Sequence, residues 1–155
     1  MKRVLLRSVY DAFDYVMDHY HPFGMEDAAP RRDSYAVISI QDTHTGGFGF
    51  TFSRSNSCRD VLTLYFDDVE REVPGAVLFS KEQAEQIIDF IRKNANANTL
   101  LVHCYGGESR SRAVAVFADE MLGLDSSRHR KGHPNRLVYQ TLKAVAQNQG
   151  TDQRA

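Results

Sequence analysis

The residue types best suited to chemistry in this chain lie in one short segment. A cysteine, Cys104, is separated by five residues from an arginine, Arg110, with Gly106 and Gly107 between them. Glycines allow the backbone to turn sharply, so that the thiol and the guanidinium can face one tetrahedral anion. A thiolate is a strong nucleophile, and a planar guanidinium can bind two phosphate oxygens at once. This spacing therefore indicates transfer of a phosphoryl group from oxygen to sulfur.

The elements around this segment would place it at an anion-binding position. Residues 100–102 form an apolar run that predicts a buried strand, and residues 111–122 predict an apolar helix. Ligands of α/β sheets bind beyond the carboxyl ends of the strands, and the amino end of a helix collects N–H groups around one point. We therefore expect the loop to form an anion site that also stabilises a thiolate at Cys104.

The rest of the chain alternates between strand and helix patterns. Short runs rich in β-branched and aliphatic residues predict strands at residues 4–6, 35–40, 61–66 and 100–102. Periodic apolar residues predict helices over residues 10–18, 81–94, 111–122 and 137–145. The alternation predicts an α/β domain whose central, mainly parallel sheet has about four to five strands, with helices on both faces. We expect one domain over residues 1–146, followed by a polar, frayed tail over residues 147–155.

The bulk composition is that of an ordinary globular protein. Hydrophobic residues make up 42% and charged residues 25% of the chain, and the formal net charge is −1. This balance provides no general attraction to nucleic acid or to an anionic membrane, and no segment is long and apolar enough to predict a membrane span. The two cysteines, Cys58 and Cys104, do not suggest a disulfide framework, so we expect a cytoplasmic protein with free thiols.

The sequence around the cysteine resembles the signature of a known enzyme family. His103-Cys104, five further residues and Arg110-Ser111 are similar to the motif of the protein tyrosine phosphatase superfamily. The flanking strand and helix resemble those of its dual-specificity branch. The resemblance extends over roughly residues 35–145, and it implies an α/β fold of the cysteine-phosphatase type.

The resemblance also implies a role for each residue of the motif. Cys104 would form a phosphocysteine intermediate, Ser111 would donate a hydrogen bond to the sulfur, and His103 would order the loop and favour the thiolate. The phosphoryl group would be bound by the Arg110 side chain and by the backbone amides of Tyr105, Gly106, Gly107, Glu108, Ser109 and Arg110. No metal or other cofactor is implied. The substrate would be a phosphorylated protein, with phosphotyrosine foremost, or a small phosphomonoester, and no nucleic-acid or membrane partner is expected.

Such an enzyme also needs a general acid that protonates the leaving oxygen, and the family takes this acid from a loop after an upstream strand. Here the apolar residues Leu62, Leu64 and Phe66 alternate along a predicted strand, and Asp68 is next in phase. We therefore favour Asp68 as the acid, with the neighbouring Asp67 as the alternative.

Two features of the loop depart from the family pattern and bear on function. Glu108 places a carboxylate where apolar, small or basic residues are more usual, so a phosphopeptide-binding module without catalysis is an alternative function. The loop contains none of the lysines that are typical of lipid phosphatases, so an inositol phospholipid substrate is not expected. A further alternative is an arsenate reductase, which shares the cysteine–arginine loop but needs additional thiols, of which only Cys58 is present.

Four other features have both a structural and a functional interpretation. Cys58 is either a partly buried core residue or a thiol that forms a disulfide with the oxidised nucleophile. Residues 46–50, rich in glycine and phenylalanine, form either a hairpin or a lid that stacks on a substrate ring. Residues 128–133 are basic and form either a solvated loop or a site for a phosphorylated or nucleic-acid partner. His19 and His21 lack other metal-binding residues at a suitable spacing, so we interpret them as loop histidines.

Overall fold

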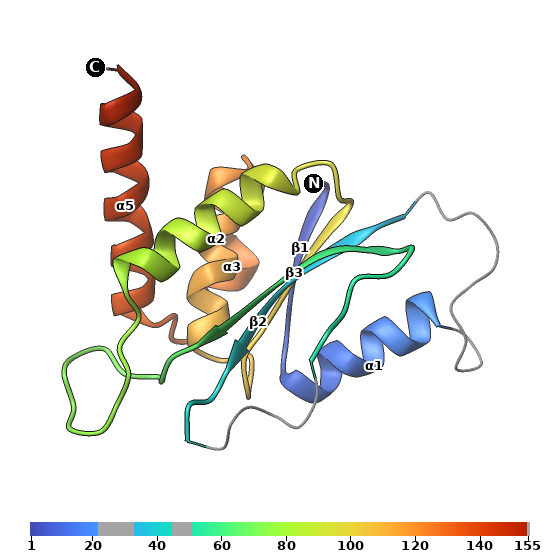
Figure 1. Cartoon of the computed structure of the whole chain (residues 1–155), viewed down its shortest axis with the longest axis horizontal. Helices are drawn as coiled ribbons and strands as arrows, with labels where there is room; N and C mark the ends of the chain where they lie inside the picture. The colour runs from blue at the N-terminus through green and yellow to red at the C-terminus, as the bar shows by residue number, and fades with distance from the viewer. Residues whose placement is uncertain (22–32, 45–50, 155) are drawn as a thin grey trace.

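A parallel β-sheet forms the centre of the molecule. The computed structural model describes residues 1–21, 33–44 and 51–154. In this part of the chain four strands form the sheet, in the spatial order β1-β4-β2-β3 (Figure 1). They are β1 (Arg3–Arg7), β2 (Tyr35–Gln41), β3 (Cys58–Tyr65) and β4 (Thr99–His103). All three neighbouring pairs are parallel, so the predicted α/β class is confirmed.

Helices cover both faces of the sheet, as the alternating pattern predicted. One face is covered by α1 (Val9–Tyr20). The other face is covered by α2 (Lys81–Lys93), α3 (Arg110–Met121) and α5 (Arg136–Arg154), as Figure 1 shows. Neighbouring residues of a strand point to opposite faces, so Leu100 packs with the three helices while Leu101 packs with α1. This two-sided burial explains why the strands are continuous apolar runs.

Capping residues set the starts of two helices. At α1 the Ser8 hydroxyl accepts a hydrogen bond from the Asp11 backbone N–H at 3.2 Å. At α2 Ser80 and Gln83 form a reciprocal capping box, which the Ser-x-x-Gln spacing predicts. Both caps satisfy N–H groups that lack partners within the first turn of a helix.

Among the strands, β3 departs most from its predicted bounds, and one short helix was not predicted. β3 begins at Cys58 rather than at residue 61, because its first residues alternate between buried and exposed positions and pair with β2. The polar Arg59 and Asp60 concealed this part of the strand. The short helix α4 (Ser127–Arg130) lies in a segment predicted to be an irregular loop.

The polar segment expected to fray after residue 146 is helical instead, because α5 continues to Arg154. Polarity alone does not end a helix. The Arg92 guanidinium of α2 donates to the Gln149 side chain at 2.8 Å, which ties this last part of α5 to the domain. The glycine-rich residues 46–50 lie outside the described residues.

Because the strands are parallel, the carboxyl ends of all four lie at the same side of the sheet. The loops after Arg7, Gln41, Tyr65 and His103 therefore start side by side. Within the described ranges, none of the helices has the length and apolarity that a membrane span requires.

Candidate active site

The Cys–Arg loop, residues 104–110, leaves β4 at the centre of this edge and enters α3. Cys104 is buried, with 3% of its surface exposed, and its Sγ lies 3.0 Å from the hydroxyl oxygen of Ser111. Arg110 is the first residue of α3 and is equally buried. Ser109, the residue before the helix, does not cap it with its side chain. The sequence-predicted nucleophile, hydroxyl donor and guanidinium therefore lie together at the amino end of one helix.

The Arg110 guanidinium is held by the ends of two neighbouring strands. Its Nη1 donates to the backbone oxygen of Phe66 at 2.9 Å, and its Nη2 lies 2.9 Å from the Asp42 carboxylate. Its Nε is buried and has no hydrogen-bond partner among the described residues. A fixed guanidinium with a donor left over is suited to bind an anion. Asp42 was not predicted; the available signal was a carboxylate directly after a buried strand.

A buried histidine fixes the backbone at the start of the loop. The Nδ1 of His103 lies 3.2 Å from the Cys104 carbonyl oxygen, and its Nε2 lies 2.7 Å from the Ser39 hydroxyl. A carbonyl oxygen can only accept, so Nδ1 carries the hydrogen and Nε2 accepts from Ser39. Gln41 in turn donates to the Ser39 hydroxyl at 2.8 Å. Burial, helped by the positive charge of Arg110, lowers the pKa of His103 to about 4, so the ring is neutral at physiological pH.

The loop packs closely against the junction between β1 and α1. Gly107 has a φ of +70°, and a Cβ on it would lie 2.9 Å from backbone atoms of Arg7 and Ser8. The Val9 N–H donates to the Tyr105 carbonyl at 3.0 Å. Gly107 is therefore the glycine that the loop requires for both conformation and space, whereas a Cβ on Gly106 would make an ordinary 3.4 Å contact.

The two predicted acid candidates, adjacent in sequence, have opposite surroundings. Asp67 is nearly buried and accepts hydrogen bonds from the Thr43 hydroxyl and the Val77 backbone N–H, each at 2.7 Å. The Val77 hydrogen bond is the main cause that lowers the pKa of Asp67. This carboxylate therefore holds its own loop together and stays ionised at physiological pH.

Asp68 is exposed and faces the Cys–Arg loop. Its Oδ1 accepts from the Ser109 hydroxyl at 2.8 Å and from the Asn135 amide at 2.9 Å. Asn135 is itself buried and also donates to the Val69 carbonyl, while its backbone N–H donates to the Ser109 carbonyl. Asn135 thus joins the loop of Asp68 to the Cys–Arg loop. It was not predicted as a site residue. The available signal was the Pro134-Asn135 dipeptide directly before the last predicted helix.

Glu108, the unusual acidic residue of the loop, points its side chain to an exposed position. The Arg112 Nε donates to the backbone carbonyl of Glu108 at 3.2 Å and not to its carboxylate. In the described parts of the chain the Glu108 carboxylate makes no ion pair. Beside it, Tyr105 is 56% exposed and meets the Tyr10 ring of α1 edge-on, with centroids 6.5 Å apart.

Cys58 lies at the opposite end of the sheet from Cys104. Tyr35 pairs with Cys58 on one side and with Thr99 on the other, so Cys104 is five residues further along the strand direction. That offset is roughly 16 Å, whereas a disulfide needs Cα atoms within about 7 Å. Burial raises the pKa of Cys58 to about 11. The interpretation of Cys58 as a disulfide partner of Cys104 is therefore wrong for this structure.

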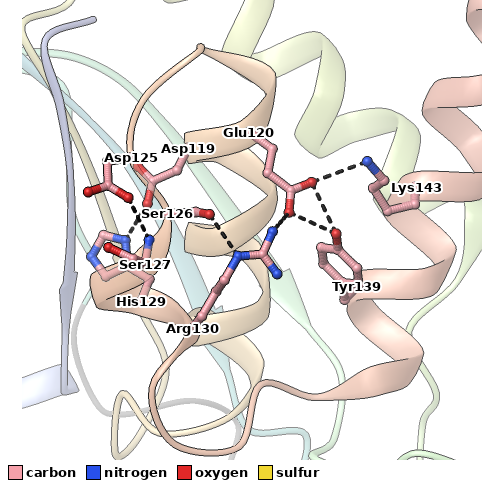
Figure 2. Close-up of polar contacts among 9 residues, drawn as sticks. All are labelled: Asp119, Glu120, Asp125, Ser126, Ser127, His129, Arg130, Tyr139 and Lys143. Atoms are coloured by element: carbon pink, nitrogen blue, oxygen red, sulfur yellow. Dashed lines mark hydrogen bonds and ion pairs between the residues drawn. The ribbon is translucent and has the colours of Figure 1, made fainter.

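The basic segment 128–133 is largely engaged within the molecule, as Figure 2 shows for two of its residues. The His129 ring lies 2.5 Å from the Asp119 carboxylate of α3, and Arg130 pairs with Glu120 of the same helix. Arg128 reaches the Val4 carbonyl at 3.5 Å. These contacts support a structural role rather than a site for a phosphorylated or nucleic-acid partner.

One of the two histidines near the end of α1 contacts a carboxylate. His19 lies 2.8 Å from the Asp33 carboxylate. Within residues 1–21, 33–44 and 51–154, no group of three or more histidine, cysteine, aspartate or glutamate side chains is arranged to hold a metal ion.

Comparison with known proteins reveals relatives in structure alone. No protein-family model matches the sequence, and no curated protein matches it. Tk-PTP in its active form is 19% identical and superposes over 95% of this chain and 93% of its own, with a TM-score of 0.53. Human DUSP28 is 15% identical over 96% and 94%, with a TM-score of 0.52. PTPMT1 in complex with PI(5)P is 14% identical over 99% and 95%, with a TM-score of 0.54.

These structures are tyrosine and dual-specificity phosphatases, and at such low identity they define a fold. This chain shares the α/β fold of these tyrosine and dual-specificity phosphatase structures. The resemblance seen around Cys104 is thereby confirmed at the level of the fold.

Proposed function

We propose that this protein is a cysteine-dependent phosphatase that hydrolyses phosphotyrosine and other phosphomonoesters. The observation that carries the proposal is the grouping of a buried thiol, an adjacent hydroxyl and an anchored guanidinium, on a fold shared with phosphatases. Every one of these groups lies at the amino end of α3, where an anion is stabilised by the helix. A reducing cytoplasm would keep the thiol free.

In the first step the Cys104 thiolate attacks phosphorus. The S–P bond forms, the bond from phosphorus to the ester oxygen breaks, and Asp68 gives its proton to that leaving oxygen. Arg110 and the backbone amides of residues 105–110 hold the three non-bridging oxygens and stabilise their charge. Asp42 and the Phe66 carbonyl keep the guanidinium in position for this role.

In the second step water attacks the phosphocysteine. Asp68, now a carboxylate, takes a proton from the water as the new P–O bond forms and the S–P bond breaks. The Ser111 hydroxyl, 3.0 Å from the sulfur, donates to the departing thiolate. Inorganic phosphate leaves, and both Cys104 and Asp68 return to their starting states.

Asp68 suits the acid role better than Asp67 does. Both hydrogen bonds of Asp68 go to Oδ1, which leaves Oδ2 to carry the transferable proton. Asp67 uses both of its oxygens to accept hydrogen bonds, and its lowered pKa keeps it ionised. Asp67 is thus engaged within its own loop, whereas Asp68 contacts the Cys–Arg loop through Ser109.

The two alternative functions are less well supported. An arsenate reductase needs a second thiol that can reach the first, and Cys58 is buried at the far end of the sheet. A binding module without turnover was suggested by Glu108, but that side chain is exposed while the catalytic groups are all present. Inositol phospholipids are not expected as substrates, because the loop has no lysine.

The test is phosphate release from an aryl phosphate, a phosphotyrosine peptide, a phosphoserine peptide and an inositol phospholipid. We expect turnover of the first two, and complete loss of turnover in Cys104→Ser with retained binding of tungstate as a phosphate mimic. Cys58→Ser is the matched control and should keep full activity. Substantial activity in Cys104→Ser would disprove the mechanism. Arsenate-dependent thiol consumption by the wild type that is lost in Cys58→Ser would instead support the arsenate reductase function.

A further inference from the structure

A cavity of about 750 Å³ opens beside Asp68 and Ser109, next to the proposed active site. Its walls come from the segment that follows Asp68 and from the first turns of α5. They include two guanidinium groups, those of Arg71 and Arg136, and the side chain of Gln140. The mechanism described above uses none of these three residues.

The cavity lies on the side of the site where the leaving group must be. Asp68 protonates the leaving oxygen, so the part of the substrate beyond that oxygen has to lie next to Asp68. Ser109 donates to Asp68 and is joined directly to Arg110, so the cavity borders the Cys–Arg loop on this side. This step of the inference rests on the proposed function.

The two arginines in the wall carry charge that the protein does not neutralise. Arg71 and Arg136 are exposed, and neither side chain makes an ion pair within the described residues. The acidic wall residue Glu70 accepts the backbone N–H of Arg136 at 2.9 Å and leaves both guanidinium groups free. The second acidic wall residue, Asp68, is hydrogen-bonded to Ser109 and Asn135, so neither carboxylate of the wall pairs with an arginine side chain in the described residues. Because the whole chain has a net charge of −1, any attraction for an anion must be local.

We propose that this cavity binds a second anionic group of the substrate, placed on the leaving-group side of the phosphoester. The ligand is a phosphopeptide that carries a carboxylate or a second phosphate close to the phosphorylated residue. A guanidinium can bind either group through two hydrogen bonds. The apolar wall residues Val69, Val73 and Leu137 would contact the uncharged part of the peptide.

The test compares three phosphotyrosine peptides of equal length, with neutral neighbours, with glutamate neighbours, or with one neighbouring phosphoserine. Two exposed ion pairs together correspond to an expected preference of about 10-fold in kcat/KM for the two anionic peptides, expressed mainly in KM. The double variant Arg71→Gln/Arg136→Gln should lose this preference and keep its rate on the neutral peptide and on an aryl phosphate. Lys131→Gln, which removes one exposed positive charge outside the cavity, is the control and should keep the preference.

The outcomes separate this inference from the proposed function. Equal kcat/KM for all three peptides in an active wild type would overturn the inference and leave the phosphatase function intact. Loss of all turnover would overturn the function itself. In the Cys104→Ser background, calorimetric dissociation constants for the same peptides give a second readout. Tighter binding of the anionic peptides that the double variant abolishes supports the cavity, and equal affinities refute it. A preference for only one anionic peptide identifies which group the cavity takes.

Discussion

The two ends of α3 both hold charged side chains, but they differ in how fully those side chains are hydrogen-bonded. At the amino end, Arg110 has two anchored nitrogens and a buried Nε without a partner in the described part of the chain. At the carboxyl end, Glu120 accepts from Tyr139, Lys143 and Arg130, as Figure 2 shows. Arg110 at the amino end therefore has an unused hydrogen-bond donor, whereas the Glu120 carboxylate at the carboxyl end already accepts from three side chains.

Two buried histidines near the ends of α3 have different partners. His129 lies against the carboxylate of Asp119, whose pKa is raised by burial, and this pair links α3 to α4. His103 is held between the Ser39 hydroxyl and the Cys104 carbonyl oxygen. Buried polar groups that hold a fold are satisfied internally, whereas a group that binds a ligand must keep a donor available. The unused donor of Arg110 is the feature that suits the amino end to bind a ligand.

The sharpest test of this comparison replaces one arginine at each end. Arg110→Lys should lower kcat/KM on an aryl phosphate by about 1000-fold, because a lysine cannot offer the fork of donors to the phosphoryl oxygens. Arg130→Lys should leave kcat/KM unchanged, since its contact with Glu120 lies at the other end of the helix. The measurement is kcat/KM of both variants from steady-state kinetics. Equal losses would mean that the two ends do not differ in function.

The next largest effect concerns the adjacent aspartates. Asp68→Asn should lower kcat by about 100-fold and remove the fall in rate at high pH, because the amide cannot supply a proton. Asp67→Asn should keep the shape of the pH profile and lower the stability of its loop, since the amide keeps only one oxygen to accept from Thr43 and Val77. The pH dependence of kcat and a denaturation curve are the measurements. A profile altered only by Asp67→Asn would assign the acid to that residue.

The smallest of these effects is a pH dependence of stability from His103. Its folded pKa of about 4 lies below its unfolded value of 6.5, so the unfolded state binds the proton first as the pH falls. Stability from this group is thus present above pH 6.5 and is lost on the way down to pH 4. Between pH 7 and pH 5 the loss is about 2 kcal/mol.

His103→Asn should remove that part of the slope in urea unfolding curves measured at pH 7 and pH 5. His133→Asn, at an exposed position, is the control and should retain the slope of the wild type. An unchanged slope in His103→Asn would mean that the ring is already charged in the folded protein, contrary to its buried surroundings.

Local patterns were sufficient to predict most of the fold. The apolar runs at β1, β2 and β4, the capping box of α2 and the alternation of strands with helices depend on neighbours in the sequence. The predictions that were wrong involved longer-range effects. The polar start of β3 is stabilised by pairing with β2, and the last part of α5 is stabilised by contact with α2.

The sequence by itself was enough to predict Cys104 as the nucleophile together with Arg110 and Ser111, because these residues lie within one turn-forming segment whose spacing is itself the signal. Only the tertiary structure decided which aspartate faces the Cys–Arg loop, and only it revealed Asp42 and Asn135. Asn135 and Asp68 are 67 residues apart in the chain. No local pattern encodes their contact, which exists because parallel strands bring distant loops to the same edge of a sheet.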